Sequence, residues 1–230
     1  MIRIKSILVA VLLVSFMSSL SAQNDKFAIE LKKIEVRLED SPSFPDQLDS
    51  KNTGNVKKWA AIFVEYEVNF KDIKMPPGSL DDGKWLDSVE VNWEFLYKPA
   101  KAQKVIQNFI RFGRSVKYVN IDEGKHKAVI LIDPKVLKRY FDEGKTIKNE
   151  LMMRVSFKAN GYKQNISIGK APYASAYFNE GKLVKDPKAL VPIFDSDRSK
   201  ALNGVVRTKA ESPFAAIQFD VFDTIAVEEK

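Results

Sequence analysis

The stretch VEVNWEFLY, residues 89–97, decides the fold. Its apolar residues, among them Val91, Trp93 and Phe95, alternate with polar ones, which places the two kinds on opposite faces of a β-strand. No other stretch of the chain alternates so cleanly. We therefore predict that residues 89–97 form a central strand of a sheet, with one face in the core.

Two similar patterns precede this stretch. Residues 27–38 alternate as well, but the alternation changes phase near Lys32 and Lys33. A β-bulge there would return the apolar side chains to one face, because it inserts one extra residue into the strand. Residues 59–70 alternate without interruption and predict a second half-buried strand. The polar segment 40–56 between them predicts a long surface loop.

Turn signals follow the central stretch. The segment DEGK, residues 122–125, separates the alternating residues 115–121 from the apolar run 128–132 and predicts a hairpin. The dipeptide Asn160-Gly161 favours a tight turn between residues 151–157 and 166–168, and predicts a second hairpin. A closing strand is expected at residues 214–227.

Residues 104–112 fit two structures. The spacing of Val105 and Phe109 is helical, and Gly113 is placed to end a helix. The β-branched and aromatic composition of the same residues favours a strand that runs on into residues 115–121. The pattern alone leaves helix and strand as alternatives.

One short helix is well marked. Asp133 can cap its first turn, and Pro134 suits the first helical position. Its apolar face consists of Val136, Leu137, Tyr140 and Phe141. We expect this helix to pack as a lid across one end of a sheet, before Gly144 ends the pattern.

Together these patterns predict an all-β fold, an immunoglobulin-like β-sandwich with one short helix and a long irregular C-terminal segment. The chain has no cysteine, so the disulfide of antibody domains cannot form and stability must come from packing and hydrogen bonds. Proline and charge increase from Lys170 onward. The role of residues 182–203 is open.

The N-terminus predicts export. Arg3 and Lys5 precede the apolar run 7–17, and small residues up to Ala22 follow, which is the pattern of a cleaved secretory signal. We expect residues 1–22 to be the signal peptide and residues 23–230 to be a single domain in the periplasm or at the cell surface. The apolar run is short for a membrane span of ~20 residues, so no transmembrane anchor is expected after cleavage.

The composition argues against several function classes. The formal net charge is +7, and basic residues alternate with acids, which favours solubility over nucleic-acid binding. His126 is the only histidine, so a zinc site of His and Cys ligands cannot form. Asp195, Asp197 and Ser199 have the spacing that opens a calcium loop, but the glycine and the final glutamate of such a loop are missing. We expect neither a metal nor another cofactor.

Two catalytic arrangements are conceivable. Ser115 lies near His126 in sequence, but no nucleophile-elbow motif surrounds the serine. Two carboxylate pairs share a strand face, on which alternate residues lie about 7 Å apart; a glycosidase could use such a pair, and any solvated strand also shows one. The pairs are Glu65 with Glu67 and Glu90 with Glu94. A carboxylate-pair hydrolase is the weaker alternative, and we expect no catalytic residue.

Three aromatic residues lie near turns or in the irregular segment and are candidates for a binding surface: Trp85, Tyr173 and Tyr177. Exposed rings at such positions can stack on a sugar or on a partner protein. A carbohydrate-binding module that uses these three rings is therefore an alternative function.

Several short motifs resemble a known family. They are RTKAESPFA at 207–215, DVFD at 220–223, YVNI at 118–121, GKH at 124–126, and Asp133-Pro134 followed by Leu137 and Arg139-Tyr140. These motifs are similar to those of small secreted immunoglobulin-like β-sandwich proteins of Verrucomicrobia and their relatives. That family is associated with type IV pilus genes.

The resemblance implies a fold and a cellular association but no active site. It implies that residues 105–112 form a strand, and it offers no counterpart for residues 182–203. We therefore expect a non-enzymatic exported accessory or interaction module at the cell envelope, linked to type IV pilus assembly, with envelope or pilus proteins as its partners.

Overall fold

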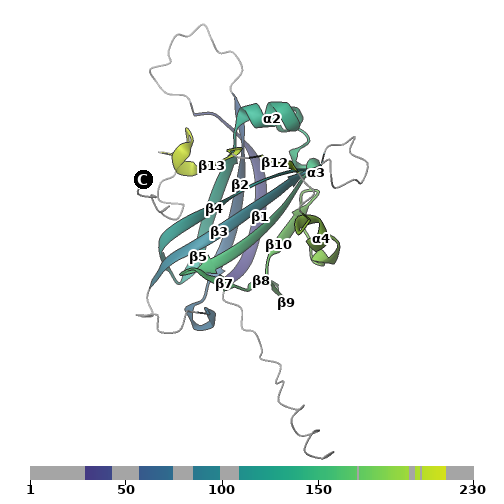
Figure 1. Cartoon of the computed structure of the whole chain (residues 1–230). Coiled ribbons are helices and arrows are strands. Elements are labelled where there is room, and N and C mark those ends of the chain that lie inside the picture. Colours follow the sequence, from purple (N-terminus) through teal and green to yellow (C-terminus); the bar gives the residue numbers. More distant parts are fainter. Residues whose placement is uncertain are drawn as a thin grey trace, which may run out of the picture.

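A computed structural model describes residues 29–42, 57–74, 85–98, 109–169, 171–196, 200–202 and 204–215. In this part of the chain two β-sheets stack face to face as a sandwich (Figure 1). The predicted all-β sandwich is confirmed. The expected signal peptide at residues 1–22 lies outside the described residues, as do most of the loop expected at 40–56 and of the strand expected at 214–227.

Sheet A has six strands in the order β13-β5-β2-β1-β8-β9. Their bounds are β1 Ile29–Asp40, β2 Lys58–Val68, β5 Gly124–Ile132, β8 Ile166–Ile168, β9 Ala171–Tyr173 and β13 Val206–Thr208. The long strands β1, β2 and β5 pair antiparallel, and the short β8 joins β1 in parallel.

Sheet B has seven strands, six of them in the order β11-β10-β6-β3-β4-β12, with β7 paired to β6. Their bounds are β3 Trp85–Tyr97, β4 Ile110–Asp122, β6 Leu151–Ala159, β7 Tyr162–Gln164, β10 Ala176–Asn179, β11 Lys182–Leu183 and β12 Lys200–Ala201. The strand predicted at residues 89–97 is part of β3, which pairs with β4 on one side and β6 on the other. It is central, as predicted.

The helices are short. The α-helices are α2 Pro134–Tyr140, α3 Ile147–Glu150 and α4 Val191–Phe194, and the 3-10 turns are η2 Phe70–Asp72, η4 Asp142–Gly144, η5 Pro187–Ala189 and η6 Lys209–Glu211. In the described residues, no helix combines the length and the apolar character that crossing a membrane requires.

The core lies between the sheets and consists of the inward faces of the long strands. Trp93, Tyr66 and Tyr118 are the largest side chains that are almost completely buried there. Each fully buried large apolar side chain of this kind contributes about 1.5–3 kcal/mol relative to an exposed one. The predicted bulge in β1 is confirmed, because the pairing of β1 with β2 shifts register between Leu31 and Lys33.

The first predicted hairpin is wrong. β4 and β5 are consecutive strands, but β4 belongs to sheet B and β5 to sheet A, so the chain crosses the core at residues 122–124. Asn120, at φ 57°, and Gly124, at φ 130°, bend the backbone at this crossing. The sequence pattern is the same for a hairpin and for a crossing between sheets, because in both cases each strand turns one face to the core.

The second predicted hairpin is half right. Asn160 and Gly161 have φ values of 46° and 80°, as a tight two-residue turn requires. The turn joins β6 to β7. Ile166–Ile168 forms β8, which lies in the other sheet beside β1.

Residues 110–112 belong to β4, as the family resemblance implies, whereas residues 104–108 lie outside the described part. Gly113 does not end a helix, because it lies inside β4 opposite Glu94. A Cβ atom at Gly113 would lie 2.3 Å from the carbonyl oxygen of Trp93. Close approach of two backbones is therefore the reason for the glycine.

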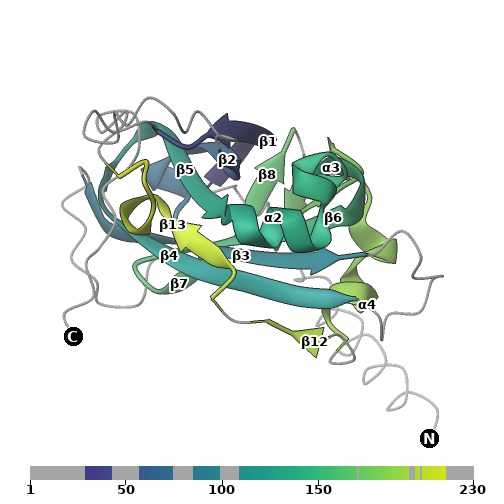
Figure 2. The same ribbon diagram turned by 90° about the horizontal axis from the view of Figure 1, so that it is seen from above.

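The predicted helix is confirmed as α2, which lies at one end of the sandwich between the two layers (Figure 2). The Asp133 carboxylate accepts a hydrogen bond of 2.7 Å from the backbone N–H of Lys135 and so caps the first turn. Leu137 and Phe141 are buried, and Val136 and Tyr140 pack against the core from its edge. The helix closes this end of the core.

We expect Leu137→Ala to lower the free energy of unfolding by about 2–5 kcal/mol, since the side chain is 1% exposed. Asp133→Ala should cost ~1 kcal/mol through the lost cap. Urea denaturation measures both, and Lys138→Ala on the exposed face of the same helix is the control. A Leu137→Ala protein as stable as its parent would contradict the role of α2 as a lid.

Candidate functional site

The outer face of sheet B carries side chains in cross-strand rows. The charged row consists of Glu90 with Lys117 and Lys158, and the polar row of Asn92 with Ser115 and Ser156. The next row contains Glu94 and Arg154, and the last contains Leu96, Arg111 and Met152. The face therefore changes from charged to apolar along the strands.

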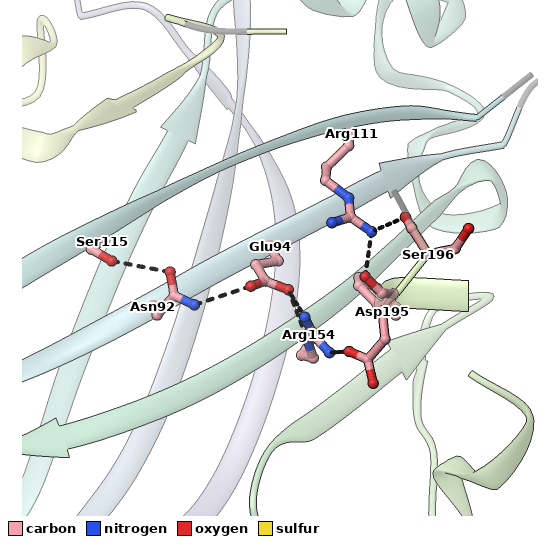
Figure 3. A network of polar contacts seen from close by, with 8 residues as sticks. Asn92, Glu94, Arg111, Ser115, Arg154, Asp195 and Ser196 are labelled. Atoms are coloured by element: carbon pink, nitrogen blue, oxygen red, sulfur yellow. Dashed lines mark hydrogen bonds and ion pairs between the residues drawn. The ribbon is translucent and has the colours of Figure 1, made fainter. Parts of the chain in front are cut away.

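A ladder of polar contacts runs across these rows (Figure 3). Ser115 Oγ lies 3.0 Å from Asn92 Oδ1, and Asn92 Nδ2 donates to Glu94 at 3.3 Å. The guanidinium of Arg154 then binds Glu94 at 2.5 Å and Asp195 at 2.5 Å. The ladder thus connects β4, β3 and β6 to a residue that is distant in sequence.

Asp195 belongs to a segment that we call the strap, residues 184–196. The strap follows β11 at one edge of sheet B, and the chain then reaches β12 at the opposite edge. It contains η5 and α4 and contacts the outer face of the sheet. This is the central part of residues 182–203, whose role the sequence leaves open.

The strap covers an apolar patch that the core does not contain. Leu190 and Phe194 of the strap pack on Leu96, Met152 and Tyr177 in a cluster separate from the main core. Phe194 is 1% exposed. Its ring meets the ring of Tyr177 edge to face, with 5.5 Å between the centroids. Without the strap these outer-face side chains would meet water.

Two arginines fix the end of the strap. Arg111 donates to the backbone carbonyls of Phe194 and, at 2.9 Å, of Ser196. Arg154 pairs with Asp195, and its guanidinium carbon lies 5.2 Å from the centroid of the Phe194 ring, a cation–π distance. Together the two arginines hold the ring and the carbonyl of Phe194 and the carboxylate of Asp195.

Burial alone would lower the pKa of the Arg154 guanidinium, but its hydrogen bonds to Glu94 and Asp195 raise that pKa above its ordinary value. Arg154 therefore stays charged at every pH that the protein meets. An 18% exposed charge of this kind needs both carboxylates, because a poorly hydrated cation without a partner is costly.

Two of the three aromatic residues predicted to form a binding surface serve the strap instead. Tyr177 is 5% exposed and forms part of the patch below Phe194. Its carbonyl accepts a 2.8 Å bond from the N–H of Val184, and the hydroxyl of Tyr173 donates to the carbonyl of Lys185 at 2.7 Å. Both tyrosines hold the beginning of the strap.

Trp85 is 53% exposed and lies at the far end of β3, opposite Asp122. Tyr177 lies beside Arg154, which in turn lies beside Glu94 of β3. Glu94 is nine residues from Trp85 along β3, so about 30 Å separate Trp85 from the position of Tyr177. Tyr173 lies in sheet A. The structure does not bring the three rings together, so they form no common platform.

The carboxylates considered for hydrolysis each pair with a cation on a neighbouring strand. Glu90 pairs with Lys158, Glu94 with Arg154, Glu65 with Lys127 and Glu67 with Lys32.

Ser115 and His126 lie in different sheets. His126 Nε2 lies 2.8 Å from the carbonyl oxygen of Asp122 and ties the crossing between β4 and β5. The described residues contain no cluster of metal-ligating side chains.

Sequence reasoning missed Arg111 and Arg154. Both lie at outward positions of alternating strands, where a charge normally meets water. The one available signal was the apolar character of their outward neighbours Leu96 and Met152, which a solvated face would not need. Such neighbours indicate that a further segment covers the face.

The sequence model of one protein family matches residues 20–229, so the chain belongs to that family. A crystal structure of a protein from Akkermansia muciniphila is similar, with a TM-score of 0.64 and 18% identity over 89% of this chain and 95% of that one. At this identity the likeness shows a shared fold. No curated protein matches the sequence.

Replacing Arg154 should lower the free energy of unfolding more than replacing Lys158, a cation on the same strand. Arg154→Met leaves Glu94 and Asp195 without their partner and should cost about 1.5–3 kcal/mol, the usual contribution of hydrogen bonds to a charged group. Lys158→Met, four residues along β6, removes a pair whose lysine is 47% exposed and should cost about 0–1 kcal/mol. Urea denaturation compares the two, and equal losses would contradict the role of Arg154.

Proposed function

We propose that this family member is a non-enzymatic, exported accessory module of the cell envelope, in the periplasm or at the cell surface, and that it is linked to type IV pilus assembly. Its partners are then envelope or pilus proteins. The pilus link is supported by the motif resemblance, and export by the signal pattern of residues 1–22. A buried central tryptophan, Trp93, supports the immunoglobulin-like description.

The observation that carries the proposal is where the motifs of the resemblance lie in the structure: their residues hold the two sheets and their closing turns together. Asp133 caps α2. Glu211 accepts from the backbone N–H of Thr208 at 3.0 Å and pairs with Arg114 at 2.6 Å, which ties η6 to β4. Tyr118 in the core donates to the carbonyl of Val129 at 3.5 Å across the two sheets. These residues hold the sandwich together, so the motifs that carry the resemblance are structural in this chain.

A scaffold of this kind offers its outer faces and added segments to partners. The strap covers the outer face of sheet B at Leu96 and Met152. A common frame with a particular surface segment is the arrangement expected of an interaction module, because binding residues are disproportionately found on segments that a rigid scaffold positions.

The pilus link is tested by deleting the gene and counting surface pili by electron microscopy. We expect fewer or shorter pili, restored by the wild-type gene. Crosslinking in cells that carry the wild-type gene should recover a pilus component. Unchanged pili and no crosslinked pilus component would refute the link while leaving the envelope location intact.

The exported location has its own test. Mass spectrometry of the protein from the periplasmic and surface fractions should find a mature chain that begins at Gln23, since cleavage is expected after Ala22. Recovery of a full-length chain in the cytoplasm alone would refute export.

A further inference from the structure

Strand β1 has one open edge over most of its length. On one side it pairs with β2 from Ile29 to Asp40. On the other side β8 pairs with it only at Ile29 and Glu30, and in the described part of the chain no strand continues the sheet beside residues 33–40. We call residues 33–40 the open edge. The backbone N–H and C=O groups that point to this side are a template for a further strand.

The inward side chains of the open edge are only partly covered. Leu38 lies opposite Ala60, a core residue, and so points to the core side of the sheet. Its side chain is nevertheless 39% exposed. Ile34 is half-buried and packs against the core from its border, whereas Val36 between them is buried. A strand added here would cover both Ile34 and Leu38.

The outward side chains of the open edge alternate in charge. They are Lys33, Glu35, Arg37 and Glu39. The carboxylate of Glu35 lies 2.7 Å from the Arg37 guanidinium and 2.6 Å from the Lys33 ammonium. Its hydrogen bonds to Arg37 and Lys33 lower the pKa of the Glu35 carboxyl to about 2. The order plus, minus, plus, minus is therefore fixed at neutral pH.

This order of charges is complementary to itself when a second β1 strand runs antiparallel to the first. The matching register is centred on Val36, which lies opposite Val36 of the second copy. Lys33 then lies opposite Glu39 of the second copy, and Glu35 opposite its Arg37. Opposite charges at directly facing positions stabilise a strand pair.

The same register matches the apolar side chains and the length of the open edge. Ile34 lies opposite Leu38 of the second copy, so the partly covered side chains cover each other. β1 of the second copy ends at Asp40, which lies opposite Lys32. The added strand therefore ends before it reaches Glu30, where β8 occupies the edge.

Neighbouring registers fail on charge or on burial. A slip of one residue places inward side chains opposite outward ones. A slip of two residues moves the centre to Glu35 or to Arg37 and sets like charges against each other. A slip of four residues restores opposite charges but shortens the paired stretch. The sequence of the open edge thus selects one antiparallel register.

We propose that the open edge of β1 is a self-association surface, at which two copies pair their β1 strands antiparallel about Val36 and join their A sheets into one. The interface has two-fold symmetry, so every charged contact occurs twice. The occupant is a second copy because the edge is complementary to itself in both charge and apolar character. This inference does not depend on the pilus link.

Sedimentation velocity of the purified protein should show a monomer–dimer equilibrium over a range of concentrations. Arg37→Glu places a glutamate opposite Glu35 of the second copy, and Glu35→Arg places an arginine opposite its Arg37. Each variant should raise the dimer dissociation constant at least about tenfold, because like charges directly opposite each other destabilise a strand pair. Lys127→Glu, on the same outer face but in β5, is the control and should leave the constant unchanged.

A mixture of the two variants separates charge contacts from damage to the fold. When Arg37→Glu protein meets Glu35→Arg protein, every facing pair again joins opposite charges, so the mixture should form dimers that neither variant forms alone. The double variant Glu35→Arg/Arg37→Glu should dimerise like the wild type for the same reason. A wild type that stays monomeric at every concentration would overturn the proposal. So would a mixture that does not associate although circular dichroism shows both variants folded.

The register has an independent test because the chain has no cysteine. In the dimer the two copies of residue 36 have their Cα atoms about 5 Å apart, a distance that a disulfide can bridge. Val36→Cys should therefore form a covalent dimer under mild oxidation. Lys33→Cys lies on the same edge but about 20 Å from its counterpart, and it should not. Absence of the Val36→Cys dimer, or equal crosslinking of both variants, would contradict this pairing.

Discussion

A two-sheet sandwich can bury only the inward faces of its strands in its core, and this constraint governs the molecule. Val91, Trp93 and Phe95 satisfy it, because they face inward from β3. Leu96 and Met152 do not, since they are apolar and face outward. With no cysteine to fix a loop over them, they depend on a strap held by packing and by Arg111 and Arg154. Sheet A has a similar need at Trp59, where Phe214 supplies part of the cover.

The two covers differ in how they are held. Phe214 follows η6, which is tied to β4 through Glu211 and Arg114, so this cover is anchored to the sandwich. The strap lies between the two-residue strands β11 and β12. Tyr173 and Tyr177 hold its beginning, and the buried Phe194 ring and the two arginines hold its end. Local opening occurs where few buried contacts hold a segment, and the strap has fewer of them than the core, so we expect it to open more readily than the sandwich.

How much the sequence could predict follows from the same constraint. Alternation reports which face of a strand is buried, so β3 and the bulge at Lys32 and Lys33 were predictable. The cap at Asp133 was predictable from the capping preference of aspartate before Pro134. Alternation does not report which strands pair, and for that reason the crossing between β4 and β5 looked like a hairpin. In the sequence Arg154 looked like an ordinary surface charge. Its role in holding the strap depends on its ion pair with Asp195, a residue that only the folded chain brings near.

The central claim is that Arg154 fixes a strap that is separable from the sandwich. Native-state hydrogen exchange tests it most directly, with the amide of Phe194, which donates to the Leu190 carbonyl at 3.0 Å, as the probe of the strap and the amides of β3 as the probe of the core. In Arg154→Met, corrected for any change in global stability, we predict faster exchange at Phe194 with β3 unchanged. Equal loss of protection in both, or none at Phe194, would contradict the account.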